Sequence, residues 1–169
     1  TITGVSSTTA DGSYGIGDVI NLTVSFSEPV VVDTSGGTPT LQLETGTIDR
    51  KATFTSGSGT NTLTFQYTVQ EGDTSADLDQ LSSTALELNG GSIADAAGNN
   101  AILTLAAPGA AGSLSADAAL VIDGVAPTIS VAINNGGDGF LNATEDSSVT
   151  ISGSTTGAEN GQTVSINIS

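Results

Sequence analysis

Carboxylate side chains are the residues of this sequence best suited to chemistry. The chain has 18 Asp and Glu residues against 2 Lys and Arg residues, and it contains no His, Cys, Met or Trp. Thiol chemistry, catalysis by a Ser-His-Asp triad and zinc sites with Cys or His ligands are therefore excluded. Oxygen donors remain, and Ca²⁺ takes about six to eight of them in flexible geometry. The composition thus points to calcium as the cofactor.

The net charge of −16 excludes two classes of partner. Nucleic acids and anionic membrane surfaces bind clustered Lys and Arg, and this chain has only Arg50 and Lys51. No apolar run reaches the roughly 18 residues of a membrane span. We therefore expect no nucleic-acid partner, no direct membrane insertion and a monomeric chain.

Paired carboxylates could also serve a glycosidase, which needs two of them in one cleft. Such clefts usually carry aromatic platforms for sugar stacking. With four Phe, two Tyr and no Trp, the chain is poorly supplied with them. We therefore expect that the protein is not an enzyme.

Alternating apolar and polar residues predict β-strands to position these acids. Residues 20–26 and 63–69 alternate most clearly, which is typical of half-buried strands. No stretch has a helical period, and two Gly residues with Pro108 argue against a regular helix across residues 106–119. The pattern predicts an all-β antiparallel sandwich of about seven to nine strands. Weaker strand candidates are residues 30–32, 40–43, 52–55, 85–88, 101–105 and 119–122.

Two modules are predicted, residues 1–125 and 126–169. Pro127 stops the strand pattern that ends at Asp123, and a new alternation begins at Ile129. A shift of 127 positions aligns the start of the first module with the second, which indicates an internal repeat. Only the beginning of the first module is matched, so we expect a chain cut from a longer tandem array, in which the partial second module is either a fragment or a short variant. The aligned pairs are Ile2 with Ile129, Asp11 with Asp138, Asp18 with Glu145, Leu22 with Val149 and Val24 with Ile151.

Several short strings carry a resemblance to a known family. They resemble the Ig-like repeats of very large bacterial surface adhesins, of the biofilm-associated and RTX type, and the related repeat of a cyanobacterial swimming-motility surface protein. The resemblance implies Ig-like sandwiches in tandem, stiffened by Ca²⁺ at their junctions, in an extracellular stalk at the bacterial cell surface. The strings are residues 10–18 (ADGSYGIGD), 26–30 (FSEPV), 89–93 (NGGSI), 95–99 (DAAGN) and 120–123 (LVID), and in the tail 138–142 (DGFLN), 151–153 (ISG) and 161–164 (GQTV).

The topology of an Ig-like sandwich would gather six acids at the end of the first module where its last strand leaves. Six carboxylates at one place would repel unless a cation lies among them, and the chain has almost no Lys or Arg to pair with them. By repetition, three further residues would serve the next junction. The predicted metal ligands are Asp11, Asp18, Asp73, Asp77, Asp79 and Asp123, followed by Asp138, Asn142 and Glu145.

Simpler explanations of these acids stay open. Asp and Gly are ordinary turn residues, so each Asp taken alone is explained equally well by a turn. The spacing of Asp73, Asp77 and Asp79 lacks the Gly and the final Glu of an EF-hand loop. A second acidic set, Glu28 and Asp95 with Asn99, is expected at the opposite end of the module, although the Glu28-Pro29 pair also fits a turn that ends a strand.

Three functions compete on this basis. The leading hypothesis is a non-catalytic extender module of a large secreted adhesin, whose partners are the neighbouring repeats and, through other domains, a cell-surface glycan or protein. The alternative is a calcium-dependent module that binds a carbohydrate or peptide through an open position on the ion. A surface-layer or motility-sheath protein would instead need an exposed apolar patch or an unprotected edge strand.

Overall fold

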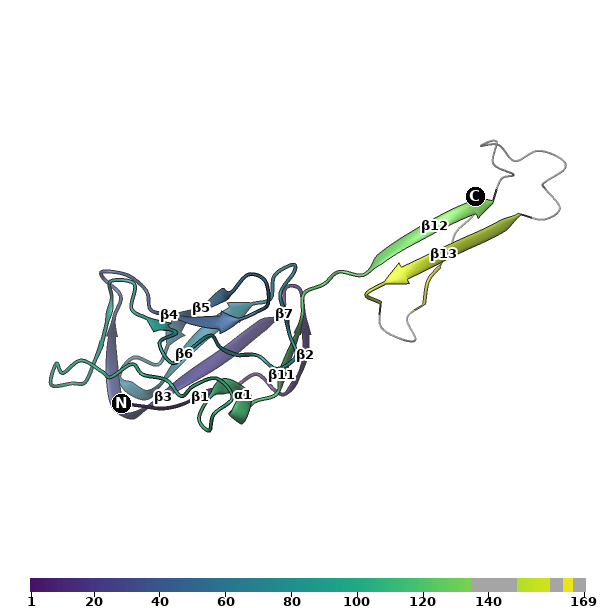
Figure 1. Ribbon diagram of the computed structural model, residues 1–169. Coiled ribbons are helices and arrows are strands. Elements are labelled where there is room, and N and C mark those ends of the chain that lie inside the picture. Colours follow the sequence, from purple (N-terminus) through teal and green to yellow (C-terminus); the bar gives the residue numbers. More distant parts are fainter. Residues whose placement is uncertain (135–148, 159–162, 166–169) are drawn as a thin grey trace. The chain divides into compact units, whose positions relative to one another are not determined.

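A computed structural model of the chain describes residues 1–134, 149–158 and 163–165 (Figure 1). The chain divides into two compact units, Thr1–Val125 and Ala126–Ser169, and this division coincides with the boundary expected from the sequence. The described elements are thirteen strands and one four-residue helix, so the prediction of an all-β protein is confirmed. No helix among the described residues is long and apolar enough to cross a membrane.

Most strands of unit 1 belong to one curled antiparallel sheet (Figure 1). Its path runs β1-β3-β6-β5-β4-β8, while β10 extends the second half of β3 and β9 pairs with β4. The bounds are β1 Ile2–Ser7, β3 Val19–Asp33, β4 Thr40–Glu44, β5 Arg50–Ser56, β6 Thr60–Thr68, β8 Asp79–Gln80, β9 Leu86–Glu87 and β10 Ser92–Ala94.

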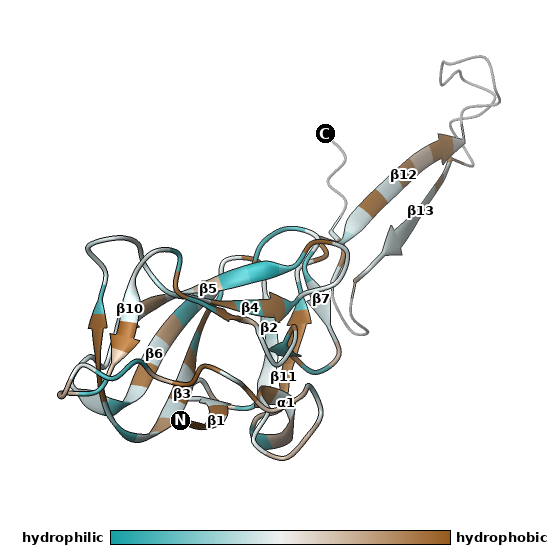
Figure 2. Cartoon of the chain, turned by 60° about the vertical axis from the view of Figure 1, so that its left-hand side comes forward, coloured by the Kyte–Doolittle hydropathy of each residue, from teal (hydrophilic) through white to brown (hydrophobic). Residues whose placement is uncertain are grey.

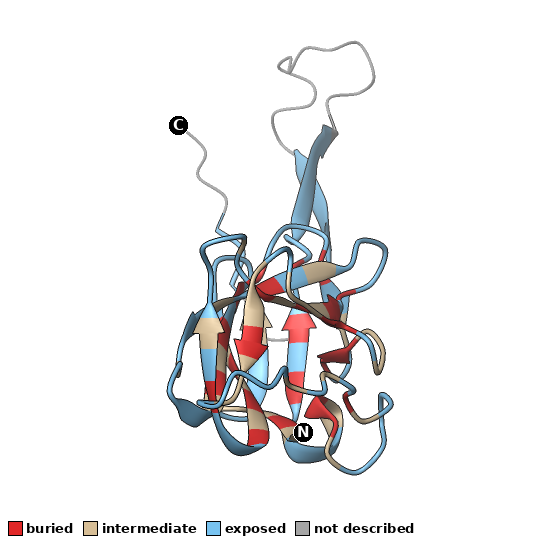
Figure 3. Ribbon diagram, turned by 90° about the vertical axis from the view of Figure 1, so that its left-hand side faces the viewer, coloured by how far each residue is buried: buried red, intermediate tan, exposed pale blue. Residues whose placement is uncertain are grey.

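The centre of this sheet is the pairing of the two strands that alternate most clearly in the sequence. Leu22 of β3 lies opposite Phe65 of β6, and Val24 lies opposite Leu63. All four side chains are fully buried, and each contributes about 1.5–3 kcal/mol by leaving water. The banding along these strands is visible in Figure 2, and the buried residues of unit 1 in Figure 3. The period of two therefore builds the core of unit 1.

A small second sheet lies where the chain leaves unit 1. It consists of β2 (Gly12–Gly15), β11 (Leu120–Asp123) and β7 (Thr74–Ser75). The central strand β11 runs parallel to β2 and antiparallel to β7. The last strand of the unit is thus held by a neighbour on each side.

The segment between β10 and β11 differs in part from the expectation. Residues 101–105 form no strand, although Leu105 is buried, because its N–H donates to the Ser83 carbonyl in a loop and not to a ladder. The helix α1 spans only Leu114–Asp117. This agrees with the prediction that residues 106–119 form no regular helix.

The described part of unit 2 is a two-stranded antiparallel sheet of β12 (Thr128–Asn134) and β13 (Thr150–Thr156). The shift of 127 positions places β12 on β1 and β13 within β3, which also pair antiparallel with each other. The registers differ by one residue, since Val5 faces Val24 in unit 1 whereas the aligned Ala132 faces Ser152. The two strand pairs therefore share their direction and their place in the alignment but not their register.

Two glycine turns of unit 1 pack backbone against backbone at the end away from β11. A Cβ atom on Gly37 would overlap the carbonyl oxygen of Asn89, and one on Gly36 would overlap that of Gly90. The Asn89 side chain also donates to the Thr38 carbonyl at 3.0 Å. Only glycine leaves room for this contact between the two turns.

Replacing Gly37 by Ala is expected to lower the free energy of unfolding by about 1–3 kcal/mol, because the added methyl group forces the two turns apart. Urea denaturation of the whole chain measures the change. Gly4→Ala is the matched control, since the nearest atoms to its added Cβ lie at an ordinary 3.8 Å. Equal stability of the two variants would contradict this account of the turns.

Candidate functional site

The structure divides the predicted metal ligands into three groups. Asp138, Asn142 and Glu145 lie outside the described residues. Two of the six acids in unit 1 are buried, Asp73 at 1% and Asp79 at 7% relative exposure. The remaining four are exposed, and they are Asp11, Asp18, Asp77 and Asp123.

Three of the exposed acids accept hydrogen bonds from backbone N–H groups. Asp18 accepts from the N–H of Gly15 at 2.9 Å, and Asp123 accepts from that of Val125 at 3.1 Å. Asp11 accepts from the N–H of Ala119, just before β11, at 2.9 Å. For Asp18 and Asp123 these are the contacts expected of acids in turns, which was the simpler explanation of each residue. Asp11 instead bonds to a segment 108 positions away.

The six acids do not meet at one point. Within the described residues, no three acidic side chains are grouped so that they could hold a metal ion. Asp73 and Asp79 are buried inside the unit. In Asp11, Asp18 and Asp123, one carboxylate oxygen accepts a hydrogen bond from a backbone N–H group. The expected convergence of six carboxylates is therefore not found in the described part of unit 1.

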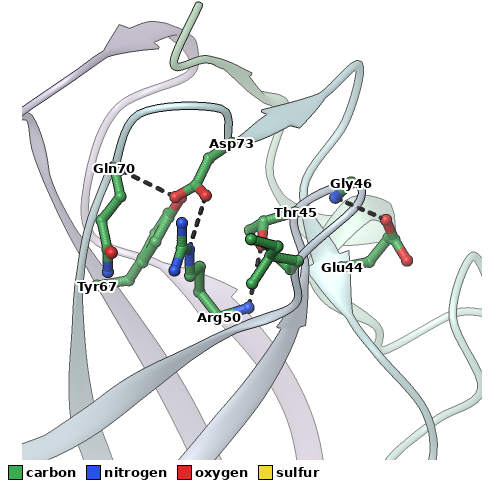
Figure 4. A network of polar contacts seen from close by, with 8 residues as sticks. Glu44, Thr45, Gly46, Arg50, Tyr67, Gln70 and Asp73 are labelled. Carbon is green, nitrogen blue, oxygen red and sulfur yellow. Dashed lines mark hydrogen bonds and ion pairs between the residues drawn. The ribbon is translucent and has the colours of Figure 1, made fainter.

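Asp73 is the centre of a polar network under β5 and β6 (Figure 4). One carboxylate oxygen accepts from Nε of Arg50 at 2.7 Å. The other accepts from the hydroxyl of Tyr67 at 2.6 Å and from the N–H of Gln70 at 2.9 Å. Arg50 is 21% exposed, so the ion pair lies between the core and the surface.

The network stabilises the charged form of Asp73. Burial opposes the charge, but the hydrogen bonds from Tyr67, Arg50 and Gln70 outweigh it and hold the pKa of the carboxyl below its ordinary value. Burial, together with the bond to Asp73, raises the pKa of the Tyr67 hydroxyl. At neutral pH the network is thus a carboxylate, a guanidinium and a neutral phenol. This arrangement stabilises structure and offers no free carboxylate oxygen for a reaction.

The backbone of Asp73 ties this network to the point where the chain leaves unit 1. Gly124 donates its N–H to the Asp73 carbonyl at 2.7 Å and accepts from the N–H of Gly72 at 2.9 Å. A Cβ atom on Gly124 would overlap the carbonyl oxygen of Gln70. The turn that carries Asp73 therefore fixes the residue after β11.

Asp79 is a second internal anchor. One oxygen accepts from the N–H groups of Gln80 at 2.8 Å and Leu114 at 3.1 Å. The other accepts from the N–H of Gly109 at 2.8 Å and from the hydroxyl of Ser115 at 2.6 Å. Four donors use the carboxylate fully, and three of them come from the long segment around α1. Asp79 thus fastens that segment to β8.

The second acidic set does come together, as expected. Glu28, Asp95 and Asn99 line one pocket of about 160 Å³ with Thr1 and neighbouring residues. Both oxygens of Asp95 accept from its own turn, from the N–H groups of Ala97 and Asn99 and from the Asn99 side chain. These bonds, the one from the Asn99 side chain foremost, lower the pKa of Asp95. The carboxylate thus closes a turn.

Asp73 has a basic partner, contrary to the expectation that the acids lack one. Arg50 pairs with it across 23 positions of the sequence, and Lys51 pairs with Glu87 at 2.7 Å on the surface. The positions of Arg50 and Lys51 at the start of a strand gave one usable signal, since neighbouring strand residues point to opposite faces. One of the two side chains could therefore be expected to point inward.

Comparisons with known proteins give no relative. No family model matches the chain, and neither a curated protein nor a solved structure matches it.

The Asp73 network predicts a specific acid sensitivity. A carboxyl with a lowered pKa stabilises the fold above its unfolded pKa of about 3.9, and this contribution is lost as the pH falls through the folded pKa. The free energy difference between the wild type and Asp73→Asn is therefore expected to be constant above about pH 5 and to shrink below about pH 4. Chemical denaturation at a series of pH values measures it. A difference that grows on acidification would contradict the assignment.

Asp79→Ala is expected to loosen the segment around α1, because three donors from that segment lose a carboxylate acceptor and only the Leu114 N–H keeps a second one, Oε1 of Gln80 at 3.0 Å. Limited proteolysis of the whole chain, with mapping of the cleavage sites, detects the loosening within residues 106–119. The exposed Asp77→Ala provides the matched control and should cut like the wild type. Protection of the segment in both variants would show that Asp79 does not anchor it.

Proposed function

We propose that the chain is part of a non-catalytic extender of a large secreted bacterial surface adhesin, built from Ig-like sandwich modules in tandem. The observation that supports this proposal is an antiparallel strand pair at aligned positions in the two units. The pair β1 and β3 opens unit 1, and the pair β12 and β13 lies 127 positions later with the same antiparallel direction and a register shifted by one residue. Tandem repetition of one supersecondary unit is typical of proteins that extend by stacking.

The arrangement of unit 1 suits a spacer. Thr1 precedes β1 at one end of the unit, and Val125 follows β11 at the other end (Figure 1). Modules with opposite ends of this kind add length when they are joined in series. The polar networks around Asp73 and Asp79 are committed to structure, which agrees with a module that holds other domains apart.

Only the exposed acids of unit 1 are proposed to bind Ca²⁺. The four exposed acids Asp11, Asp18, Asp77 and Asp123 have the oxygen donors that Ca²⁺ prefers. They do not form a complete site, since within the described part of the chain no three acids are grouped for a metal ion. We propose that Ca²⁺ bound by these acids stiffens the chain next to the junction that follows Val125, with further oxygens supplied from outside unit 1. Asp73 and Asp79 are excluded from this set, because both are buried and their oxygens accept hydrogen bonds inside the unit.

The acidic composition supports a place outside the cell, where Ca²⁺ is plentiful. A charge of −16 destabilises a compact chain by self-repulsion, and bound divalent cations reduce it. Neighbouring repeat modules are the proposed partners of this chain. Contact with a cell-surface glycan or protein is assigned to other domains of the adhesin.

Calcium is expected to raise the unfolding temperature of the whole chain, whereas Mg²⁺ is not. At a Ca²⁺ concentration of about 100 times the Kd, linkage adds about 2.7 kcal/mol, or roughly 5–10 °C for a chain of this size. Thermal unfolding in EDTA, in CaCl₂ and in MgCl₂ measures the shift. If neither ion has an effect, the acids are turn residues only and the calcium part of the proposal fails.

Solution scattering tests the spacer itself. In CaCl₂ the wild-type chain is expected to show a well-defined maximum dimension, and EDTA should broaden the distribution. Asp123→Ala should be broad in both conditions, while the exposed Glu71→Ala, at a residue outside the predicted ligand set, should behave like the wild type. A particle whose dimensions ignore both calcium and Asp123 would contradict a calcium-stiffened spacer.

A further inference from the structure

The way the first and last strands are held in unit 1 has a mechanical consequence. This inference rests on the proposed spacer function and goes beyond it. We propose that unit 1 is built to bear tension between Thr1 and Val125, and that the sheet of β2, β11 and β7 is the element that resists it.

The last strand is held along its whole length. β11 pairs with β2 from Leu120 opposite Gly12 to Asp123 opposite Gly15. On its other side, β11 pairs with β7 at Ile122 and Asp123, and the Leu120 carbonyl accepts from the N–H of Leu78 at 2.8 Å. A strand with a neighbour on both sides can leave only by breaking both sets of hydrogen bonds.

Both ends of β11 have additional fastenings. Before the strand, Asp11 accepts from the N–H of Ala119, and the Ala119 carbonyl accepts from the N–H of Gly12 at 3.0 Å. After the strand, Gly124 is bonded to Gly72 and Asp73. Asp73 is itself fixed by Arg50 and Tyr67 inside the unit (Figure 4). The load on Val125 therefore passes into the core and not into a free loop.

The direction of the strands makes this load a shearing one. β2 and β11 are parallel, and both run toward the end of the unit where the chain leaves at Val125. Tension pulls β11 forward along its axis, while β2 is held back by the rest of the unit and by β1. All hydrogen bonds between the two strands then carry load together, because no single bond can open before its neighbours. Pulling both strands from the same end would instead open these bonds one after another.

The first strand meets the load in a similar way. Force on Thr1 draws β1 backward along β3, with which it pairs from Ile2 opposite Phe26 to Ser7 opposite Leu22. The strand β3 is in turn bonded to β6 over most of its length. Each terminal strand of unit 1 is therefore loaded along its own axis against a strand that is anchored in the sheet.

Single-molecule force measurements on the whole chain test the proposal. The chain has no Cys, so paired substitutions define the points of attachment. One variant carries Thr1→Cys and Val125→Cys and applies shear to β2 and β11, with unit 2 outside the loaded path. The other carries Ile16→Cys and Val125→Cys, both at exposed positions just beyond the same ends of these two strands. Complete opening of residues 1–125 is recognised by a gain in length on the order of 400 Å.

The unfolding force in the first geometry is expected to exceed that in the second severalfold. Within the first geometry, and in EDTA so that Asp11 binds no calcium, Asp11→Ala should lower the force because it removes the acceptor of the Ala119 N–H group. Asp11→Asn keeps an acceptor and should retain most of the force. Equal forces in the two geometries would overturn the proposal. So would an Asp11→Ala variant that loses stability in urea while its unfolding force stays unchanged.

These outcomes are separable from those of the spacer test. Scattering reports whether the chain holds a defined length without load, and the force measurement reports how unit 1 resists load. A spacer with equal forces in both geometries overturns this inference and leaves the proposed function intact. If unit 1 resists shear strongly but the chain shows no calcium-dependent stiffness, the calcium-stiffened spacer is overturned and the mechanical inference stands.

Discussion

A chain with 18 acidic and two basic residues must stabilise its carboxylates with something other than cationic side chains, and this constraint governs the structure. Backbone N–H groups stabilise many of these carboxylates by donating hydrogen bonds to them. They bond to Asp11, Asp18, Asp33, Asp73, Asp79, Asp95 and Asp123, and to Glu44. Each such bond satisfies a backbone donor that a turn leaves without a ladder partner. The acids therefore fix the turns and the strand ends of a fold that is poor in ion pairs.

The two most buried acids show how far this use of carboxylates reaches. Asp79 collects four donors and fastens the segment around α1 to the main sheet. Asp73 combines the inward-pointing Arg50 with Tyr67 and Gln70, and its backbone fixes Gly124. Because a buried carboxylate without partners would be costly, these networks must form together with the fold. They belong to the structure of unit 1 and not to a site for a ligand.

The hydrogen bonds of β11 matter both for the proposed spacer function and for the proposed resistance to tension. Unit 1 has its ends on opposite sides, and its last strand is bonded to two neighbours. The same bonds that define where the chain leaves the unit also resist a pull on that point. Calcium would act at the exposed acids and would change the freedom of the chain beyond Val125. Two of these acids also belong to the load-bearing part, since Asp11 fastens the start of β11 and Asp123 ends that strand. Stiffness and strength are thus assigned to groups of residues that overlap at Asp11 and Asp123.

The sequence by itself determined what depends on near neighbours. The period of two placed residues 20–26 and 63–69 in the central strands, because alternate side chains point to opposite faces of a sheet. Pro127 and the new alternation at Ile129 marked the division between the units. Charge and composition directed attention to oxygen ligands, and the exposed acids are still the proposed ones.

Only the tertiary structure decided which partner each carboxylate has. Asp73 meets Arg50 across 23 positions, Asp79 meets Leu114 across 35, and Asp11 meets Ala119 across 108. A spacing rule cannot find such pairs, because the distance along the chain carries no information once the strands have been ordered in a sheet. The six acids were expected at one point, yet five of them, all but Asp77, accept hydrogen bonds from donors at different places in the fold. Burial and backbone hydrogen bonding, which arise only in the folded chain, therefore separated the structural acids from the exposed ones.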